Sequence, residues 1–170
     1  MMFRWFLYIL IFSLFSSQAL CTDAIPRSEV ADFTLDTING ESINLSEFKG
    51  KVIIISFWAT WCKPCIQELG FLKKLHKKLA KDLVVLAIST DGPDSASAVE
   101  EKVQSKGLTM PVLLDPSGEV LAQFNPGGSL PFSVYIDRNG RLHSTHDGFA
   151  IGDDIKIEKI VKSLIVEKRK

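Results

Sequence analysis

The sequence has little cysteine and no surplus of charge. Three cysteines occur among 170 residues, and twenty basic side chains balance twenty acidic ones, so the formal net charge is zero. Proteins that attract nucleic acid or an acidic partner through their overall field carry a clear excess of basic residues. The composition therefore favours neither nucleic acid nor an acidic protein as a partner, and the lysine-rich segment 72–81 is interpreted as a solvated helix face.

The cysteines are too few for a structural zinc site. Cys62 and Cys65 form the only Cys-x-x-Cys pair, whereas such a site needs about four ligands. His143 and His146 do not complete the set, because an odd spacing on a strand turns two side chains to opposite faces. We therefore expect no metal and no bound cofactor, and we interpret His76 as a packing or surface residue.

Repeats, low-complexity blocks and linkers are also absent, and the length suits one sizeable core. We expect one domain over residues 31–170, preceded by a lead-in at 20–30. Before it, Arg4 is followed by an apolar run and by small residues that end at Ala19, which is the pattern of a signal peptide at residues 1–19.

The apolar run is shorter than the ~20 residues of a membrane-spanning helix, although an uncleaved anchor that reaches Leu20 stays open. Both alternatives predict export, to the periplasm or to the outer face of the cytoplasmic membrane. Cys21 lies where a bacterial lipoprotein carries its acylated cysteine, but Leu20 stands where that signal has a small residue. Three fates of Cys21 therefore stay open: attachment of a lipid, a free thiol, and removal with the signal peptide. Because exported proteins meet an oxidising compartment, the pair Cys62 and Cys65 is interpreted as redox-capable.

The apolar pattern predicts an α/β fold with a mixed central sheet flanked by helices. Uninterrupted apolar runs at 51–58 and 83–89 are typical of strands covered on both faces. A shorter strand is expected at 111–115, followed by a brief apolar segment. Helices are expected where apolar residues recur at three- and four-residue steps: from Cys62 to Leu79, over 95–107 and over 153–168.

Two Asn-Gly dipeptides predict β-hairpins. Asn39-Gly40 lies inside the alternating segment 32–45 and favours a type I′ turn. Asn139-Gly140 separates two further strand-like segments, 131–137 and 141–148. The predicted order of elements is therefore hairpin, β, α, β, α, β, hairpin, α.

The stretch FWATWCKPCIQEL, residues 57–69, carries the chemistry. The strand is expected to end near Ala59 and the helix to begin near Cys62, where free N–H groups and the helix dipole stabilise an anion. Such a position and the Cys-x-x-Cys spacing lower a cysteine pKa from ~8.5 to between ~3.5 and ~7.5. Cys62 is therefore the predicted nucleophile, and Cys65, one turn further along, is placed to attack a mixed disulfide. Pro64 fits the first turn, where its missing N–H costs little.

Residues 32–69, DFTLDTINGESINLSEFKGKVIIISFWATWCKPCIQEL, resemble the exported, membrane-associated thioredoxin-like thiol-disulfide oxidoreductases of the TlpA/ResA type, which are related to the AhpC/TSA-Redoxin group of the thioredoxin superfamily. The likeness covers roughly residues 31 to 165. It implies a thioredoxin fold with an added N-terminal β-hairpin and a central αβ insertion. It also implies a disulfide-bearing exported protein as substrate and a membrane electron donor, and we expect a monomer.

The resemblance assigns further site residues. Pro131, in GGSLPFSVYID, matches the family's cis-proline, beside which Leu130 would lend its backbone to a substrate strand. Glu68 matches the family's active-site glutamate, and helical geometry places positions 65 and 68 on one face. A partly desolvated carboxylate there could take the proton of Cys65, whereas a surface charge that complements the helix dipole is the alternative. The expected substrate-binding surface comprises Trp61, Lys63, Pro64, Leu130 and Phe132.

Three positions depart from the family pattern. Ser56 stands where cytoplasmic thioredoxins keep a buried aspartate, so the dependence on Glu68 should be greater. Gly70 replaces the proline that usually follows the glutamate, which puts the customary helix kink in doubt. Phe132 stands where a small hydroxyl residue is common and could reshape the substrate groove.

We therefore expect an exported protein-disulfide reductase that acts on envelope proteins, for example in cytochrome c maturation, and cycles through Cys62 and Cys65. An oxidase or isomerase stays open, because the Lys63-Pro64 dipeptide does not fix the potential. A peroxidase is not favoured, since Ala59 stands where its threonine is expected. A copper-delivering protein on the same fold would carry a wider cysteine spacing and a distal histidine ligand, and neither is evident.

Overall fold

The computed structural model describes residues 27–167. The predicted signal segment 1–19, Cys21 and the last predicted helical residue, Lys168, lie outside the described residues. Within the described part, no helix is both long enough and apolar enough to cross a membrane.

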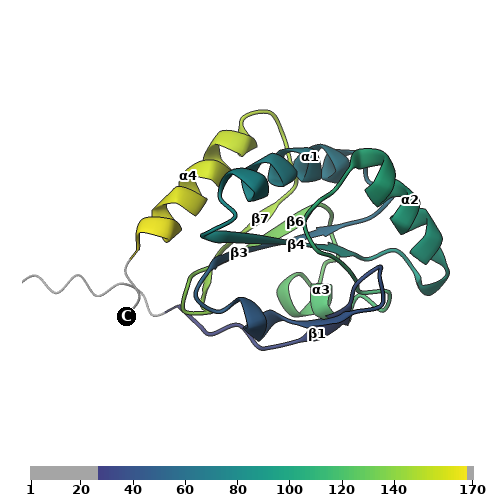
Figure 1. Ribbon diagram of the computed structural model, residues 1–170, viewed down its shortest axis with the longest axis horizontal. Helices are drawn as coiled ribbons and strands as arrows, with labels where there is room; N and C mark the ends of the chain where they lie inside the picture. The colour runs from purple at the N-terminus through teal and green to yellow at the C-terminus, as the bar shows by residue number, and fades with distance from the viewer. Residues whose placement is uncertain (1–26, 168–170) are drawn as a thin grey trace, which may run out of the picture.

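A five-stranded mixed sheet forms the centre of the fold (Figure 1). Its strands are β3 (Val52–Trp58), β4 (Leu83–Ser89), β5 (Val112–Leu114), β6 (Phe132–Ile136) and β7 (Leu142–Asp147). The order across the sheet is β5-β4-β3-β6-β7, with β3, β4 and β5 parallel and the other two pairings antiparallel. Every residue of β3 and β4 is buried, as their unbroken apolar runs predicted, because both faces of the sheet are covered.

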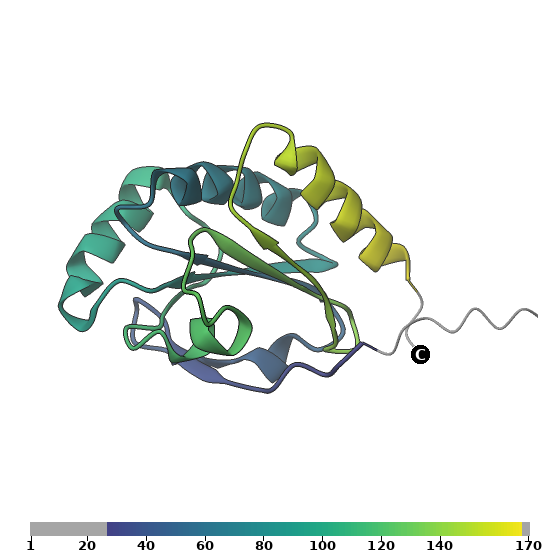
Figure 2. The ribbon, with the colours of Figure 1, turned by 180° about the vertical axis from the view of Figure 1, so that it is seen from behind.

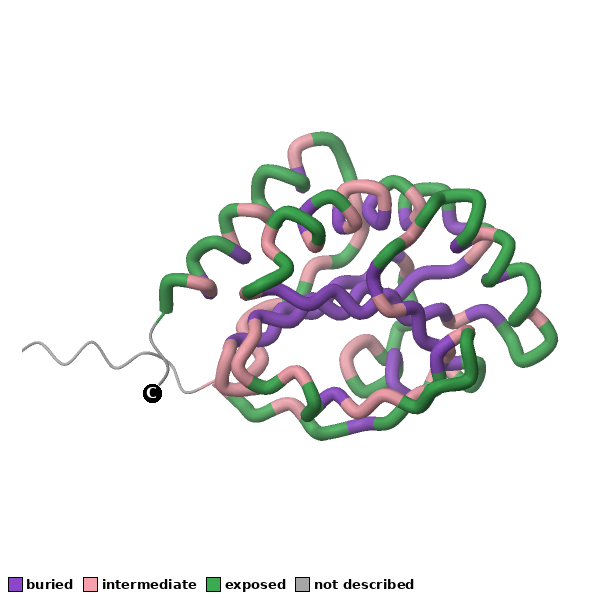
Figure 3. Tube along the Cα trace, viewed as in Figure 1, coloured by how far each residue is buried: buried purple, intermediate pink, exposed green. Residues whose placement is uncertain are grey.

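Three helices cover one face of the sheet. They are α1 (Lys63–Lys78), α2 (Ala96–Lys106) and α4 (Asp153–Val166), and both ribbon views place them on the same side (Figures 1 and 2). The predicted apolar faces of α1 and α4 point into this layer, and their fully packed members are Leu69, Leu72, Leu75, Ile157, Val161 and Leu164. Burial accordingly concentrates in the sheet and on the inner turns of the helices (Figure 3).

The opposite face is covered by the N-terminal hairpin and by a short helix. The hairpin strands are β1 (Thr34–Asp36) and β2 (Ser42–Asn44), and the helix is α3 (Glu119–Phe124). A 3-10 turn, η1 (Leu45–Phe48), follows β2, whereas a second one, η2 (Pro93–Ser95), directly precedes α2 and contacts it. Side chains from the hairpin region and α3 form a second core cluster with alternate residues of the sheet. The hairpin is a separate two-stranded sheet that touches the main one at the bridge between Thr37 and Leu113.

The turn of this hairpin is not the predicted type I′. That turn needs a positive φ at two successive residues, yet within the described chain only glycines have one, here Gly40 with φ 81°. The connection is wider: Gly40 N–H donates to the Thr37 carbonyl, and Thr37 N–H donates to the Glu41 carbonyl. The Thr37 hydroxyl accepts the N–H groups of Asn39 and Glu41 and so holds the longer loop.

The predicted second hairpin is present and uses the same turn. Gly140 has φ 79°, and the Asp137 carboxylate accepts the N–H groups of Asn139 and Arg141 at 2.8 and 3.0 Å. The same carboxylate also pairs with the Arg141 guanidinium, which explains how it remains charged at 2% exposure.

Helix α3 was not predicted, because the sequence suggested only a brief apolar segment there. It has six residues and begins after Gly118, which has φ 71°. Asp115 supports it from outside the helix, since its Oδ2 accepts the Leu121 N–H at 2.9 Å. Together α2, β5 and α3 occupy the chain between β4 and β6, where the resemblance implied an αβ insertion.

Residues 27–30, expected as part of a lead-in, already contact the fold. Arg27 pairs with Asp137 and with Glu167 at 3.3 and 2.8 Å, and Glu29 bridges to Arg141. The start of the described chain is therefore fastened to the β6–β7 turn and to the end of α4.

Candidate active site

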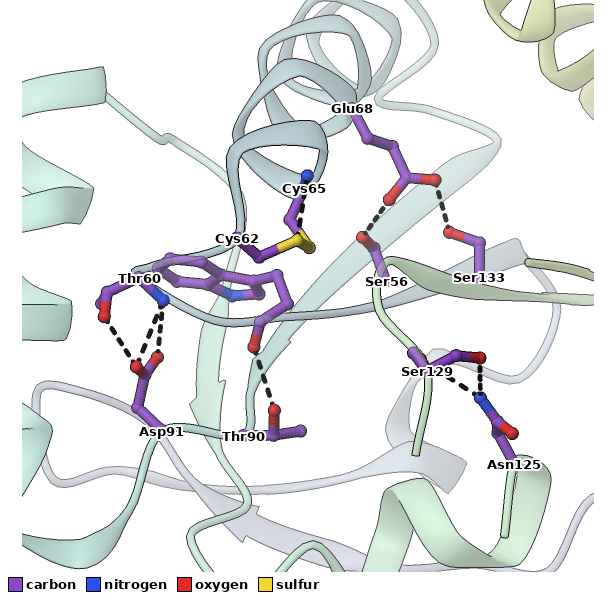
Figure 4. The surroundings of a disulfide bond; sticks show 11 residues. Ser56, Thr60, Cys62, Cys65, Glu68, Thr90, Asp91, Asn125, Ser129 and Ser133 are labelled. Atoms are coloured by element: carbon purple, nitrogen blue, oxygen red, sulfur yellow. Dashed lines mark hydrogen bonds between the residues drawn. A yellow bond between two sulfur atoms is a disulfide. The ribbon is translucent and has the colours of Figure 1, made fainter. Parts of the chain in front are cut away.

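Two buried cysteines form a disulfide at the start of α1 (Figure 4). Cys62 is the N-cap of the helix, and the Cys65 N–H donates to the Cys62 sulfur at 3.3 Å. Cys62 is 4% exposed and Cys65 is fully buried, so Cys62 is the residue that a partner reaches first. When the pair is reduced, the N–H at the helix start favours a thiolate on Cys62.

The structure brings most of the predicted substrate residues to the surface around Cys62. Trp61 is 76% exposed, Lys63 and Pro64 are exposed, and Leu130 is half-buried. Phe132 differs: it is 7% exposed and packs in the core cluster on the hairpin side of the sheet. Its ring is therefore not part of this surface, because side chains alternate along β6.

The loop before β6 is held from two sides. The Leu130–Pro131 peptide bond is cis, as the resemblance implied. Ser129 accepts a hydrogen bond from Asn125 at the end of α3 (2.9 Å) and donates one to Asp147 at the end of β7 (2.8 Å). The Gly148 N–H donates to the Pro131 carbonyl, so α3 and β7 together fix the loop beside the disulfide.

Glu68 is fully buried, which goes beyond the partial desolvation expected and excludes the surface-charge alternative. Its carboxylate accepts one hydrogen bond from the Ser56 hydroxyl and one from the Ser133 hydroxyl, both at 2.8 Å (Figure 4). Ser56 and Ser133 are direct partners across β3 and β6. The serine that replaces the thioredoxin aspartate therefore holds a carboxyl group that comes from α1.

The environment of Glu68 favours its protonated form. Burial raises the pKa of Glu68, while the hydroxyls of Ser133 and Ser56 act in the opposite direction. Tyr135, on the same face of β6, is fully buried, and burial together with the Glu68 charge raises its pKa as well. Tyr135 thus stays neutral over the working range of pH. Of these two buried groups, Glu68 is the one whose pKa moves toward neutral pH, which is the direction that a general base requires.

Neither β7 histidine joins the cysteines. His146 pairs with Ser133 across the strands, and its Nε2 lies 3.2 Å from Asp153 Oδ2. A register shift in the β6–β7 pairing places a bulge at His143, so the strict alternation assumed for the two side chains is not kept. Within residues 27–167, no group of three or more His, Cys, Asp or Glu could hold a metal ion. His76 is half-buried on α1, in keeping with a packing role.

A network that the sequence did not reveal lies on the other side of the cysteines. Asp91 follows β4, and its carboxylate accepts the Thr60 N–H at 2.9 Å, the Thr60 hydroxyl at 2.7 Å and the Ser89 hydroxyl at 2.7 Å. Next to it, the Thr90 N–H donates to the Trp58 carbonyl at 2.9 Å. The end of β4 therefore holds the turn between β3 and α1. Thr60 and Asp91 are 31 positions apart in the chain, so no local sequence pattern indicates this contact.

Known proteins resemble the chain over most of its length. Residues 26–145, which include both cysteines, Glu68 and Pro131, match the model of the AhpC/TSA family. The thiol-disulfide oxidoreductase ResA of Geobacillus kaustophilus is 34% identical over 130 residues, or 76% of this chain and 73% of that protein.

Solved structures resemble it in the same way. A thiol:disulfide interchange protein, DsbE from Chlorobium tepidum, has a TM-score of 0.75 at 27% identity and covers 82% of this chain and 96% of its own. A pneumococcal exposed lipoprotein thioredoxin, Etrx1 from Streptococcus pneumoniae, has a TM-score of 0.64 at 36% identity, over 79% of this chain and all of its own.

Proposed function

Because this chain belongs to the AhpC/TSA family and is a thioredoxin-like thiol-disulfide oxidoreductase of the TlpA/ResA type, we propose that it works as an exported protein-disulfide reductase. The observation that carries the proposal is Cys62 at the N-cap of α1, bonded to Cys65 and facing its N–H. That arrangement stabilises one reactive thiolate and keeps a second sulfur within reach of it.

The first step is the attack of the Cys62 thiolate on a disulfide of the substrate protein. A bond forms between Cys62 and one substrate sulfur, and the other substrate sulfur leaves as a thiolate. Exposed Trp61 and the backbone beside Pro131 would position the substrate strand next to Cys62, with Leu130 at its edge.

The second step releases the substrate. Glu68 takes the proton of the Cys65 thiol, and the Cys65 sulfur attacks Cys62, which re-forms the Cys62–Cys65 disulfide. The second substrate sulfur leaves as a thiolate and is then protonated by solvent. The substrate gains two electrons and this protein loses two, so a dithiol carried by a membrane electron donor must reduce it again.

The location and the partners belong to the same proposal. The predicted signal segment 1–19 would export the chain or anchor it in the membrane, and one structural relative is named an exposed lipoprotein. The substrates would be envelope proteins with a disulfide, among them apocytochromes, and the protein would act as a monomer on the outer face of the cytoplasmic membrane or in the periplasm.

Replacement of the cysteines tests the reaction. Cys62→Ser should lower the rate of disulfide reduction to the uncatalysed rate, because no Cys62 thiolate remains to attack the substrate disulfide. Cys65→Ser should instead accumulate a mixed disulfide between Cys62 and the substrate, because no sulfur resolves it. Both are measured by incubating the reduced protein with a disulfide-bonded test protein and following free thiols and covalent adducts by mass. A Cys62→Ser variant that reduces the test protein at the wild-type rate would refute the proposal.

A further inference from the structure

We propose that Asp91 is a positioning residue that keeps the cysteine pair reducing: its buried carboxylate holds the turn before Cys62 and, by like charge, disfavours the Cys62 thiolate. The inference rests on the proposed reductase function, since it concerns the direction in which the same two sulfurs exchange electrons.

The contacts of Asp91 show a built site for a negative charge. The residue is 9% exposed, and both carboxylate oxygens accept hydrogen bonds, from the N–H and hydroxyl of Thr60 and from the hydroxyl of Ser89. The Ser89 oxygen in turn accepts the Asp91 N–H at 3.2 Å. All of these donors are uncharged, so they orient the carboxylate without cancelling its charge.

The charge is held close to the nucleophile. Thr60 precedes Cys62 by two residues, which limits the separation of their Cα atoms to about 7 Å. The turn is tight, because the Cys62 N–H donates to the Ala59 carbonyl at 3.0 Å. Figure 4 shows Asp91 directly against Thr60, on the side of the turn away from Glu68. The carboxylate lies one hydrogen bond of 2.7 to 3.2 Å beyond Thr60, so its separation from the Cys62 sulfur is roughly 10 Å, which is comparable to the Debye length of ~8 Å at physiological ionic strength. Burial weakens the screening of this charge further.

A negative charge at this place acts against the reduced state. The reduced pair carries a thiolate on Cys62, whereas the disulfide is neutral, so a nearby carboxylate raises the free energy of the reduced form alone. A less stable reduced form is a stronger electron donor. The helix start makes Cys62 reactive, and Asp91 limits how far the same thiolate is stabilised.

The test is the thiol-disulfide equilibrium of Asp91→Asn with glutathione, followed by tryptophan fluorescence. We expect the equilibrium constant for reduction of the protein to rise roughly three- to tenfold, which corresponds to a potential about 15 to 30 mV less negative. The pKa of the Cys62 thiol, followed by its rate of alkylation against pH, should fall in the same variant. Asp91→Glu keeps the charge and should stay within twofold of the wild type in the same equilibrium.

Three further variants separate charge from geometry. Thr60→Val removes one hydrogen bond of the turn but leaves the carboxylate, and should change the equilibrium less than twofold. Asp94→Asn removes an exposed charge three residues away and should also have little effect, because water screens it. Asp91→Ser, also neutral, replaces Asp91→Asn if circular dichroism shows that the asparagine variant does not fold.

An unchanged equilibrium in the neutral Asp91 variants would overturn the inference, and so would an equal shift in Thr60→Val, which would assign the effect to geometry. Neither result touches the reductase proposal, which depends on disulfide reduction by the unchanged protein and its loss in Cys62→Ser.

Discussion

In the proposed mechanism, Glu68 accepts a proton while it is surrounded by protein and by two hydroxyl groups. General bases contribute about 10²- to 10⁴-fold to a rate, so Glu68→Gln should slow the release of the substrate from the mixed disulfide by about 100-fold at pH 7. Stopped-flow measurement of thiol release follows this step. Glu100→Gln, on the exposed face of α2, is the matched control, and a Glu68→Gln rate within threefold of the wild type would contradict the assignment.

The same residue should couple stability to pH. Burial raises the pKa of Glu68 above its ordinary value of 4.5, so above that value the folded protein keeps a proton that the unfolded chain releases. Stability therefore falls as the pH rises from 4.5 toward the raised folded value. We expect Glu68→Gln to gain in Tm relative to the wild type at pH 8 and to lose that gain at pH 4. Thermal melts over this range measure it, and a difference in Tm that does not vary with pH would contradict it.

The residues proposed to react were predictable from local sequence because they are at most six positions apart in the chain. The strand, the helix start and the Cys-x-x-Cys spacing located Cys62 and Cys65, and the family pattern located Glu68. The depth of Glu68 was not predictable, because it depends on Ser133, which is 65 residues away in the chain. Asp91 was missed for the same reason: its contacts form only when β4 lies beside β3.

At the scale of elements, the start of α4 depends on Asp153. Three groups lower the pKa of Asp153 to about 2: first the Lys156 ammonium, then the Ala150 N–H, and to a smaller extent His146. Lys156 Nζ lies 2.9 Å, Ala150 N 2.8 Å and His146 Nε2 3.2 Å from the Asp153 carboxylate oxygens. The stabilisation is present above the unfolded value near 3.8 and is lost as the pH falls through 2.

Asp153→Asn should therefore lower Tm by a few degrees at pH 6, and the difference from the wild type should close between pH 4 and pH 2. Asp154→Asn, the exposed neighbour on the same helix turn, serves as the control. Equal effects of the two substitutions at pH 6 would show that a general helix-dipole effect, and not the Lys156 contact, is responsible.

The elements themselves show where sequence patterns are reliable. Continuous apolar runs predicted β3 and β4, and the three- and four-residue steps predicted α1 and α4, because burial on a sheet leaves a repeating signal. The type I′ turn at Asn39-Gly40 was wrong because Thr37 offers its hydroxyl to the loop, which favours a longer connection. Helix α3 was missed because its support comes from Asp115, outside its own six residues.

At the scale of the whole molecule, the direction of electron flow is a single measurable quantity. We expect the equilibrium reduction potential of Cys62/Cys65 to lie near or below about −250 mV, toward the thioredoxin end of the range. Titration with glutathione or dithiothreitol, with the fluorescence of Trp58 and Trp61 as the signal, gives the value. A potential near about −120 mV would mean that the reduced form is the stabilised one, and the protein would then be an oxidase.

The global arrangement could be predicted only in part. The order of the elements and the mixed sheet follow from the apolar pattern. The placement of the hairpin on the face opposite to α1 does not follow from that pattern. The apolar character of Phe33 and Leu45 predicts that they are buried, but it does not say against which face of the sheet they pack. Arg138 is similar: its guanidinium joins the Gly50 carbonyl, Asp82 and the Ile165 carbonyl, three segments that come together only in the folded chain.

The three groups proposed to react directly, Cys62, Cys65 and Glu68, all belong to the first two turns of α1 or its cap. Strands β3 and β6 contribute only hydrogen-bond donors, the Ser56 and Ser133 hydroxyls that contact the Glu68 carboxylate. The proposed reactive part of this protein is therefore one contiguous segment of seven residues, 62–68, so a single replacement would exchange it for that of a relative while every strand of the host keeps its sequence.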